Sequence, residues 1–224
     1  HGIAETAGLL LVPAQGEVRL LTDFRYKIQA EREVPWAETI LYPKGLLNLL
    51  KGLLPKLRIR TLAFESHYTL HSMAAKMTVS LGKMGIETIA QTHLVEDFRR
   101  IKDEEEIHLI RQAVRLNEAV FTEIFDSFSA FKTESEVAQA IEATMRRKGA
   151  TGPSFSTIVA SGDNGALPHA VPSSTTLRRD GSLTIDMGLV LDGYCSDMTR
   201  NFVPGTASQR YLEVHRIVRR AQLA

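Results

Sequence analysis

The sequence predicts an α/β domain over residues 1–95, followed by part of an α+β domain over residues 96–224. Three observations predict this fold class. Short strand patterns alternate with helical patterns in the first part, two long amphipathic helices with capping signals open the second part, and a hairpin pattern follows those helices. A chain of 224 residues is long enough for two modest domains.

The first 95 residues carry the alternating strand and helix patterns. Four apolar runs have the length and residue types of strands: residues 9–12, 18–21, 60–64 and 86–90. Two longer runs have the apolar spacing of buried helix faces: residues 46–57 and 70–84. Gln15 and Gly16 favour a hairpin between the first two strands, and Gly85 is typical of a helix C-cap. This order predicts a small mixed sheet with helices.

A polar and charged segment near residues 95–102 marks the expected domain boundary, and two capped helices are predicted after it. Asp103 with Glu106, and Thr133 with Glu136, have the spacing of a capping box. The expected buried positions of the two helices are Ile107, Ile110, Val114, Phe121 and Ile124, and then Val137, Ala140, Ile141 and Met145. A strand is expected next, and a last helix after a capping serine: residues 156–160 and Ser208.

The segment 183–203 has the pattern of a β-hairpin. Its centre, Asp192-Gly193, favours a two-residue type I′ turn, because glycine adopts positive φ at little cost and aspartate tolerates it. Such a turn fixes the register, so that the numbers of any two paired residues add up to 385. One face of the hairpin is then apolar and suited to a core: Leu183, Ile185, Met187, Leu189, Met198 and Phe202.

The opposite face of this hairpin holds two carboxylates. In the predicted register Asp186 faces Thr199, and Asp197 faces Gly188. The two aspartates are then diagonal neighbours, with Cβ atoms about 7 Å apart or somewhat less. Gly188 is expected to leave open volume beside them. Thr199 is expected either to orient Asp186 or to be an ordinary strand residue.

Two carboxylates placed in this way favour a metal ion between them. At about 5 Å and an effective dielectric constant near 20 they repel each other by about 3 kcal/mol, and a divalent cation removes that conflict. Oxygen ligands suit Mg, Ca or Mn, and additional imidazole ligands suit Zn, Fe or Co. By spacing alone, a solvent-exposed polar strand face explains the same residues equally well.

Four segments, in order along the chain, resemble the pita-bread metallopeptidases, the family of Xaa-Pro aminopeptidase, prolidase, creatinase and methionine aminopeptidase. Residues 185–200 resemble the segment in which that family places two metal-binding aspartates eleven positions apart. Residues 161–173 resemble the segment with its substrate-binding histidine, and residues 100–113 resemble the first helix of its catalytic domain. Residues 20–30 resemble the accessory N-terminal domain of the proline-specific members.

The resemblance implies a creatinase-type accessory domain over residues 1–95 and the first half of a pita-bread catalytic domain over residues 96–224. It implies that Asp186 and Asp197 are metal ligands and that His169 binds the substrate and takes part in catalysis. An imidazole near neutral pH is suited to hydrogen-bond a substrate carbonyl or a developing oxyanion.

The implied cofactors are two divalent metal ions, Mn in the first place, with Co, Zn or Fe as alternatives. The family's other ligands, one His and two Glu, lie beyond the second aspartate, and no residue here is assigned to them. The chain is therefore expected to be a piece of a longer protein and to be inactive by itself.

The implied activity is release of the N-terminal residue from peptides with proline in the second position, by a homodimer. A dipeptidase of the prolidase type is the alternative within the enzymes, and a metal-free binding or scaffold protein is the alternative outside them. The net charge of +1 gives no reason to expect nucleic acid or an anionic membrane as a partner, and no apolar run approaches the length of a membrane span. The single cysteine, Cys195, fits a reducing compartment, and a cytoplasmic location is expected.

Overall fold

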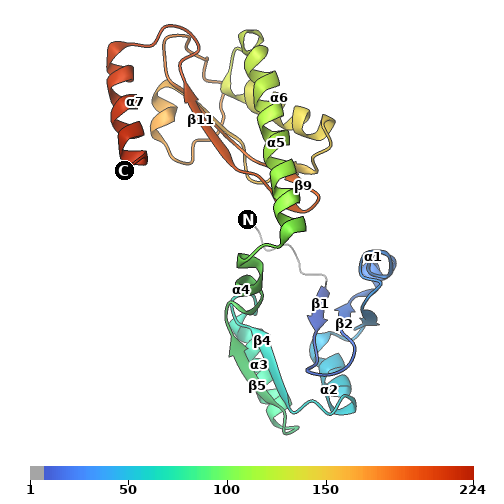
Figure 1. Cartoon of the computed structure of the whole chain (residues 1–224). Helices are drawn as coiled ribbons and strands as arrows, with labels where there is room; N and C mark the ends of the chain where they lie inside the picture. The colour runs from blue at the N-terminus through green and yellow to red at the C-terminus, as the bar shows by residue number, and fades with distance from the viewer. Residues whose placement is uncertain (1–7) are drawn as a thin grey trace. The chain divides into compact units, whose positions relative to one another are not determined.

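The computed structural model describes residues 8–224, which divide into two compact units, one ending at Arg100 and the next beginning at Ile101. Figure 1 shows the first unit in blue to green and the second in green to red. None of the helices within residues 8–224 is long and apolar enough to span a membrane.

The first unit contains two small sheets and short helices. Its elements are β1 (Gly8–Leu11), β2 (Arg19–Thr22), η1 (Phe24–Tyr26), α1 (Lys27–Glu33), β3 (Glu38–Leu41), α2 (Leu46–Lys56), β4 (Thr61–Glu65), α3 (His71–Gly82), β5 (Glu87–Gln91) and α4 (Leu94–Arg100). β1 and β2 form the expected antiparallel hairpin, and β3 lies parallel to β2. These three strands form the expected small mixed sheet, and β4 and β5 form a separate parallel pair later in the chain.

Four elements of the first unit were not expected from the sequence: η1, α1, β3 and α4. Each has only three to seven residues, which is too short for an apolar period to distinguish helix, strand and loop. The helix end predicted at Gly85 is confirmed. Gly85 has a φ of 73°, and its N–H and that of Ile86 donate to the carbonyl oxygens of Gly82 and Leu81, the pattern of a Schellman motif.

Apolar side chains from both helices and strands form the core of the first unit. The buried members are Leu11, Leu21, Leu50, Leu54, Met77, Leu81 and Ile86. All seven lie in the helical and strand patterns that the sequence predicts, because the apolar spacing reflects the burial of these side chains.

The second unit combines two long helices with two three-stranded antiparallel sheets. Its elements are α5 (Glu104–Asp126), η2 (Phe128–Ala130), α6 (Glu134–Arg147), β6 (Gly152–Pro153), β7 (Ile158–Ser161), η3 (Gly162–Ala166), β8 (Leu183–Met187), β9 (Leu189–Leu191), β10 (Tyr194–Cys195), β11 (Met198–Phe202) and α7 (Gln209–Gln222). The strand orders are β11-β8-β7 and β10-β9-β6. α5 and α6 pack on each other and against the strands (Figure 1).

Both predicted capping boxes are confirmed. Asp103 begins α5 and exchanges hydrogen bonds with Glu106, each between a side chain and a backbone N–H. Thr133 and Glu136 do the same at the start of α6. Ser208 caps α7 as expected, with its Oγ accepting from the Tyr211 N–H at 3.1 Å.

The end of α6 is tied to α5 by ion pairs. Lys148 Nζ lies 3.0 Å from one carboxylate oxygen of Glu123, and Arg147 contacts the other. Hydrogen bonds from Lys148 and Arg147 hold the pKa of Glu123 below its usual value. The cations thus offset the helix dipole, as their position predicts, and also join the two helices.

The predicted buried face of α5 needs a correction. Val114 is exposed, whereas Ala113 and Asn117 of the same helix are buried. The reason is a polar contact: Asn117 Nδ2 donates to the backbone carbonyl of Met187 in β8 at 3.1 Å. An asparagine on a helix is usually expected to face solvent, so the apolar pattern included Val114 in place of Asn117. The other predicted positions hold: Ile124 is buried, Phe121 packs against the core, and Ile107 and Ile110 are half-buried.

The predicted turn and register of the hairpin are confirmed. Asp192 and Gly193 have φ values of 49° and 80°, as a type I′ turn requires. Tyr194 pairs with Leu191, and Thr199 pairs with Asp186, so the same register holds on both sides of a break in the strands. The apolar face lies in the core of the unit, where Leu183, Ile185, Met187 and Leu189 are buried and Met198 and Phe202 pack against them.

Candidate metal and substrate site

The polar face of the β8–β11 pair carries the first predicted metal ligand. Asp186 is half-buried and accepts a hydrogen bond on Oδ1 from the Thr199 hydroxyl at 2.5 Å. On the same face, Asn201 Nδ2 donates to the Thr184 hydroxyl at 2.7 Å. Of the two readings of Thr199, the one in which it orients Asp186 is therefore the one that the structure supports, and Asp186 Oδ2 stays available to a ligand.

The second predicted ligand, Asp197, lies where the strands are interrupted. β8 ends at Met187 and β9 begins at Leu189, while residues 196 and 197 separate β10 from β11. Asp197 is exposed, and no hydrogen bond or ion pair to its carboxylate is found among residues 8–224. Asp197 directly precedes Met198, the first residue of β11, and Met198 pairs with Met187 of β8.

The interruption is stabilised by two serines and leaves no room at Gly188. Ser196 Oγ accepts from the Leu189 N–H at 3.1 Å, and Ser154 Oγ donates to the Ser196 carbonyl at 3.0 Å. A Cβ atom on Gly188 would lie 2.2 Å from that carbonyl oxygen and 2.6 Å from a ring carbon of Phe155. The expectation of open volume at Gly188 is thus wrong, because the protein's own backbone and side chains fill it.

The donor chemistry of the two aspartates fits a hard divalent cation, as part of a ligand set. Both residues offer carboxylate oxygens without a competing cationic partner within the described part of the chain. Over the same residues, no group of three or more His, Cys, Asp and Glu side chains is arranged to hold a metal ion. Two carboxylates alone supply fewer ligands than a transition metal takes.

His169 lies in a connection between η3 and β8, not on a helix or strand. It is exposed, and the turn around it is closed by backbone hydrogen bonds from Leu167 to Asn164 and from Ala170 to Leu167. Ala170 is buried and anchors the turn. An exposed imidazole held next to an anchored residue is accessible to a ligand.

One residue of this region escaped the sequence-based prediction. Glu134, the first residue of α6, is fully buried and hydrogen-bonds to the connection that contains His169. In the sequence it follows a helix N-cap, where an acidic residue is explained by the helix dipole alone. No local signal indicates that its side chain turns inward.

A hydrogen bond also joins the turn end of the 183–203 hairpin, called the ribbon below, to helix α5. The Tyr194 hydroxyl of β10 donates to a carboxylate oxygen of Glu106 at 2.9 Å. This hydrogen bond raises the pKa of Tyr194 above its usual value, with a smaller contribution from desolvation. Glu106 thus serves the capping box and the ribbon at once.

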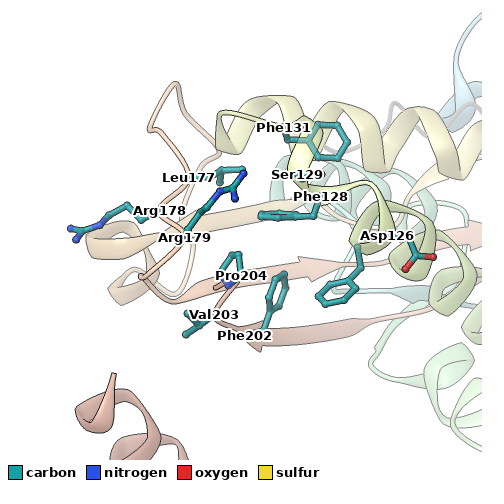
Figure 2. A pocket seen from close by; sticks show the side chains of 11 residues that line it. Asp126, Phe128, Ser129, Phe131, Leu177, Arg178, Arg179, Phe202, Val203 and Pro204 are labelled. Atoms are coloured by element: carbon teal, nitrogen blue, oxygen red, sulfur yellow. The ribbon is translucent and has the colours of Figure 1, made fainter. Parts of the chain in front are cut away.

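A pocket of about 310 Å³ lies beside the C-terminal end of β11 (Figure 2). Its lining combines aromatic and basic side chains: Phe125, Asp126, Phe128, Ser129, Phe131, Leu177, Arg178, Arg179, Phe202, Val203 and Pro204. Phe202 belongs to the apolar face of β11, opposite to Thr199. The pocket is therefore separate from the predicted ligands, and none of its lining residues is one of them.

Comparison with known sequences identifies the family. Residues 108–224 match the profile of Metallopeptidase family M24, and residues 2–101 match that of the Creatinase/Prolidase N-terminal domain. The chain belongs to metallopeptidase family M24. The resemblance to the pita-bread metallopeptidases is thereby confirmed, together with a fold of a creatinase-type N-terminal domain and part of the M24 domain.

Individual M24 proteins resemble this chain over nearly all of its length. An uncharacterized peptidase, YqhT, of Bacillus subtilis (strain 168) is 31% identical over 221 residues, which are 99% of this chain and 62% of the relative. The structure of an X-Pro aminopeptidase from Thermotoga maritima MSB8 has a TM-score of 0.83 and 35% identity, over 96% of this chain and 60% of that one. A Xaa-Pro dipeptidase from Bacillus anthracis has a TM-score of 0.85 and 33% identity, over 99% and 61%. The chain thus spans about three fifths of the length of these relatives.

The packing at Gly188 gives a testable prediction for stability. Gly188→Ala places a methyl group against the Ser196 carbonyl and Phe155, and we expect it to lower the free energy of unfolding by about 1–3 kcal/mol or more, as overpacking does. The free energy of unfolding is measured by urea denaturation followed by circular dichroism.

Gly52→Ala is the matched control for this substitution. Gly52 lies inside α2 with no atom within 4 Å of an added Cβ, so we expect a gain of about 0.5–1 kcal/mol from helix propensity. A Gly188→Ala variant as stable as the unsubstituted protein would contradict the close packing described here.

Proposed function

We propose that the protein containing this chain is a metal-dependent peptidase that releases the N-terminal residue from peptides with proline in the second position. Asp186 and Asp197 are the proposed metal ligands, and His169 is the proposed substrate-binding and catalytic residue. The observation that carries the proposal is the Thr199–Asp186 hydrogen bond on the polar face of a ribbon in an M24 domain. It gives one predicted ligand a fixed orientation and leaves its second oxygen available.

The proposed cofactors are two divalent metal ions, Mn in the first place, with Co, Zn or Fe as alternatives. When bound, such ions supply Lewis-acid polarisation of the scissile carbonyl and lower the pKa of water. The chain's own carboxylates would bind and orient the ions, and the Thr199 hydroxyl would hold Asp186 in the ligating rotamer.

His169 is proposed to act on the substrate and not on the metal. An exposed imidazole on an anchored turn can donate a hydrogen bond to the carbonyl oxygen that precedes proline. This hydrogen bond would strengthen as negative charge develops on the carbonyl oxygen in the transition state. It would therefore raise kcat more than it lowers KM.

Aminopeptidase and dipeptidase activities are both represented among the similar structures, an X-Pro aminopeptidase and a Xaa-Pro dipeptidase. For the aminopeptidase we expect kcat/KM on Ala-Pro-Ala to exceed that on Ala-Pro by at least about tenfold, because binding of the residues after proline contributes to the transition state. Product analysis by chromatography with the full-length protein measures this ratio. A ratio reversed in favour of the dipeptide would assign prolidase activity instead.

The alternative outside the enzymes is a metal-free binding or scaffold protein, which the peptidase relatives do not favour. Isothermal titration of Mn into the full-length protein tests it. We expect binding that Asp186→Ala weakens by at least about 100-fold, together with loss of hydrolysis, because removal of a ligand leaves an incomplete set. Absence of binding, with Asp186→Ala indistinguishable from the unsubstituted protein, would support the scaffold.

The role of Thr199 yields a sharper prediction. Thr199→Val keeps the shape of the side chain but removes the donor to Asp186, and we expect Mn affinity to fall by roughly 10–100-fold. Thr184→Val is the matched control, because it breaks the hydrogen bond to Asn201 on the same face and touches neither aspartate. Equal losses in both variants, measured by the same titration, would show that Thr199 acts only through the stability of the ribbon.

Two further proposals concern the protein as a whole. A homodimer follows from the family resemblance, and sedimentation equilibrium of the full-length protein tests it. A cytoplasmic location is proposed because the single Cys195 is free and exposed, which suits a reducing compartment.

A further inference from the structure

The fully buried carboxylate of Glu134 is the most completely hydrogen-bonded acidic group of the second unit outside the predicted site. Its Oε1 accepts from the Ser161 N–H at 2.7 Å and from Asn164 Nδ2 at 3.1 Å. Its Oε2 accepts from the Ser173 N–H at 3.1 Å, from the Ser173 hydroxyl at 2.8 Å and from Asn164 Nδ2 at 3.0 Å. Four donor groups thus converge on one carboxylate.

All of these donors are neutral. No Lys, Arg or His forms an ion pair with Glu134 within residues 8–224. Its charge is stabilised instead by the four donors and by its place as the first residue of α6, near the positive end of the helix dipole. A buried charge kept in this way is costly unless every bond is made, so the donors are held firmly.

The donors come from both ends of one connection. Ser161 is the last residue of β7, Asn164 lies in η3, and Ser173 lies twelve residues after Ser161. His169 is between them, four residues before Ser173. One carboxylate therefore closes the segment 161–173 into a loop whose free part carries the predicted substrate-binding histidine.

The backbone of α6 reinforces the same closure. The N–H of Ser135 donates to the Ser173 carbonyl at 3.0 Å, and the N–H of Glu134 donates to the Thr175 carbonyl at 3.2 Å. The N–H groups of the first helical turn, which have no acceptor inside the helix, thus bind the C-terminal end of the loop. The Glu134 side chain binds its N-terminal end, at Ser161 and η3.

We propose that Glu134 is a positioning residue for His169: it joins the two ends of the 161–173 loop and so sets where the imidazole stands relative to Asp186 and Asp197. The inference rests on the proposed function of His169. A displacement of about 1 Å in a catalytic group is enough to lower a rate by about 100-fold, so firm closure of the loop has a direct effect on the reaction.

Glu134→Gln in the full-length, metal-loaded protein tests the closure. The amide has the shape of the carboxylate, but it replaces one accepting oxygen with a donor, so either the Ser161 or the Ser173 N–H loses its acceptor. We expect the amides of residues 161–175 to exchange with deuterium at least about tenfold faster. Mass spectrometry of peptides from this segment measures the exchange.

Glu136→Gln is the matched control. It removes the same charge two residues away on the same helix, where Glu136 accepts from the N–H groups of Lys132 and Thr133 and touches no part of the loop. We expect its effect to be confined to the start of α6. Equal exchange in the 161–175 segment of the two variants would overturn the proposal.

A double-mutant cycle tests whether Glu134 acts through His169. We expect Glu134→Gln to lower kcat/KM on an Xaa-Pro substrate by about 10–100-fold at unchanged Mn occupancy, mainly through kcat. His169→Ala combined with Glu134→Gln should lose no more than His169→Ala alone, since a misplaced group and an absent one are equivalent. Losses that multiply would overturn the proposal.

Two outcomes separate this inference from the proposed function. A protein in which His169→Ala leaves Xaa-Pro hydrolysis unchanged would refute the role of His169, whatever Glu134 does to the loop. Unchanged loop exchange in Glu134→Gln would refute the closure, whatever the activity. Should Glu134→Gln fail to fold, Asn164→Ala removes one donor from a half-buried position and is expected to accelerate exchange in the same segment.

Discussion

The antiparallel pairing of β8 with β11 is the constraint on which the rest of the second unit depends. The turn at Asp192-Gly193 adopts positive φ at both central residues and thereby admits only one register. That register sends Leu183, Ile185 and Met187 into the core and places Asp186 opposite Thr199. A slip of one residue would bury the aspartate and expose the core, so packing and chemistry select the same pairing.

Buried polar contacts connect this ribbon to the helices around it. Asn117 of α5 donates to the Met187 carbonyl, and Glu134 of α6 binds the loop that leads into β8. Such groups are costly to bury without partners, so each one fixes the position of the element it contacts more narrowly than apolar packing does. The helices thus act as a frame that holds both the ribbon and the His169 loop.

The break at Gly188 shows how the ribbon combines regular pairing with a local irregularity. Ser154 and Ser196 supply the hydrogen bonds that the interrupted strands would otherwise make, and the same register resumes on both sides. Interruptions of this kind re-aim individual side chains without shifting a whole strand. Asp197 lies in this break, whereas Asp186 lies in regular strand.

By itself the sequence determined those features that depend on nearest neighbours in the chain: the capping boxes at Asp103 and Thr133, the Schellman end at Gly85, and the turn with its register. It also indicated the M24 family through four ordered segments. Only the tertiary structure decided that Asn117 of α5 is buried, that Gly188 is tightly enclosed, that β4 and β5 pair apart from the first sheet, and that Glu134 turns inward. Each of these depends on partners far along the chain, such as Met187 for Asn117 and Ser173 for Glu134. Local propensity and apolar spacing carry no information about such partners, because a buried polar residue is recognisable only by the groups that satisfy it.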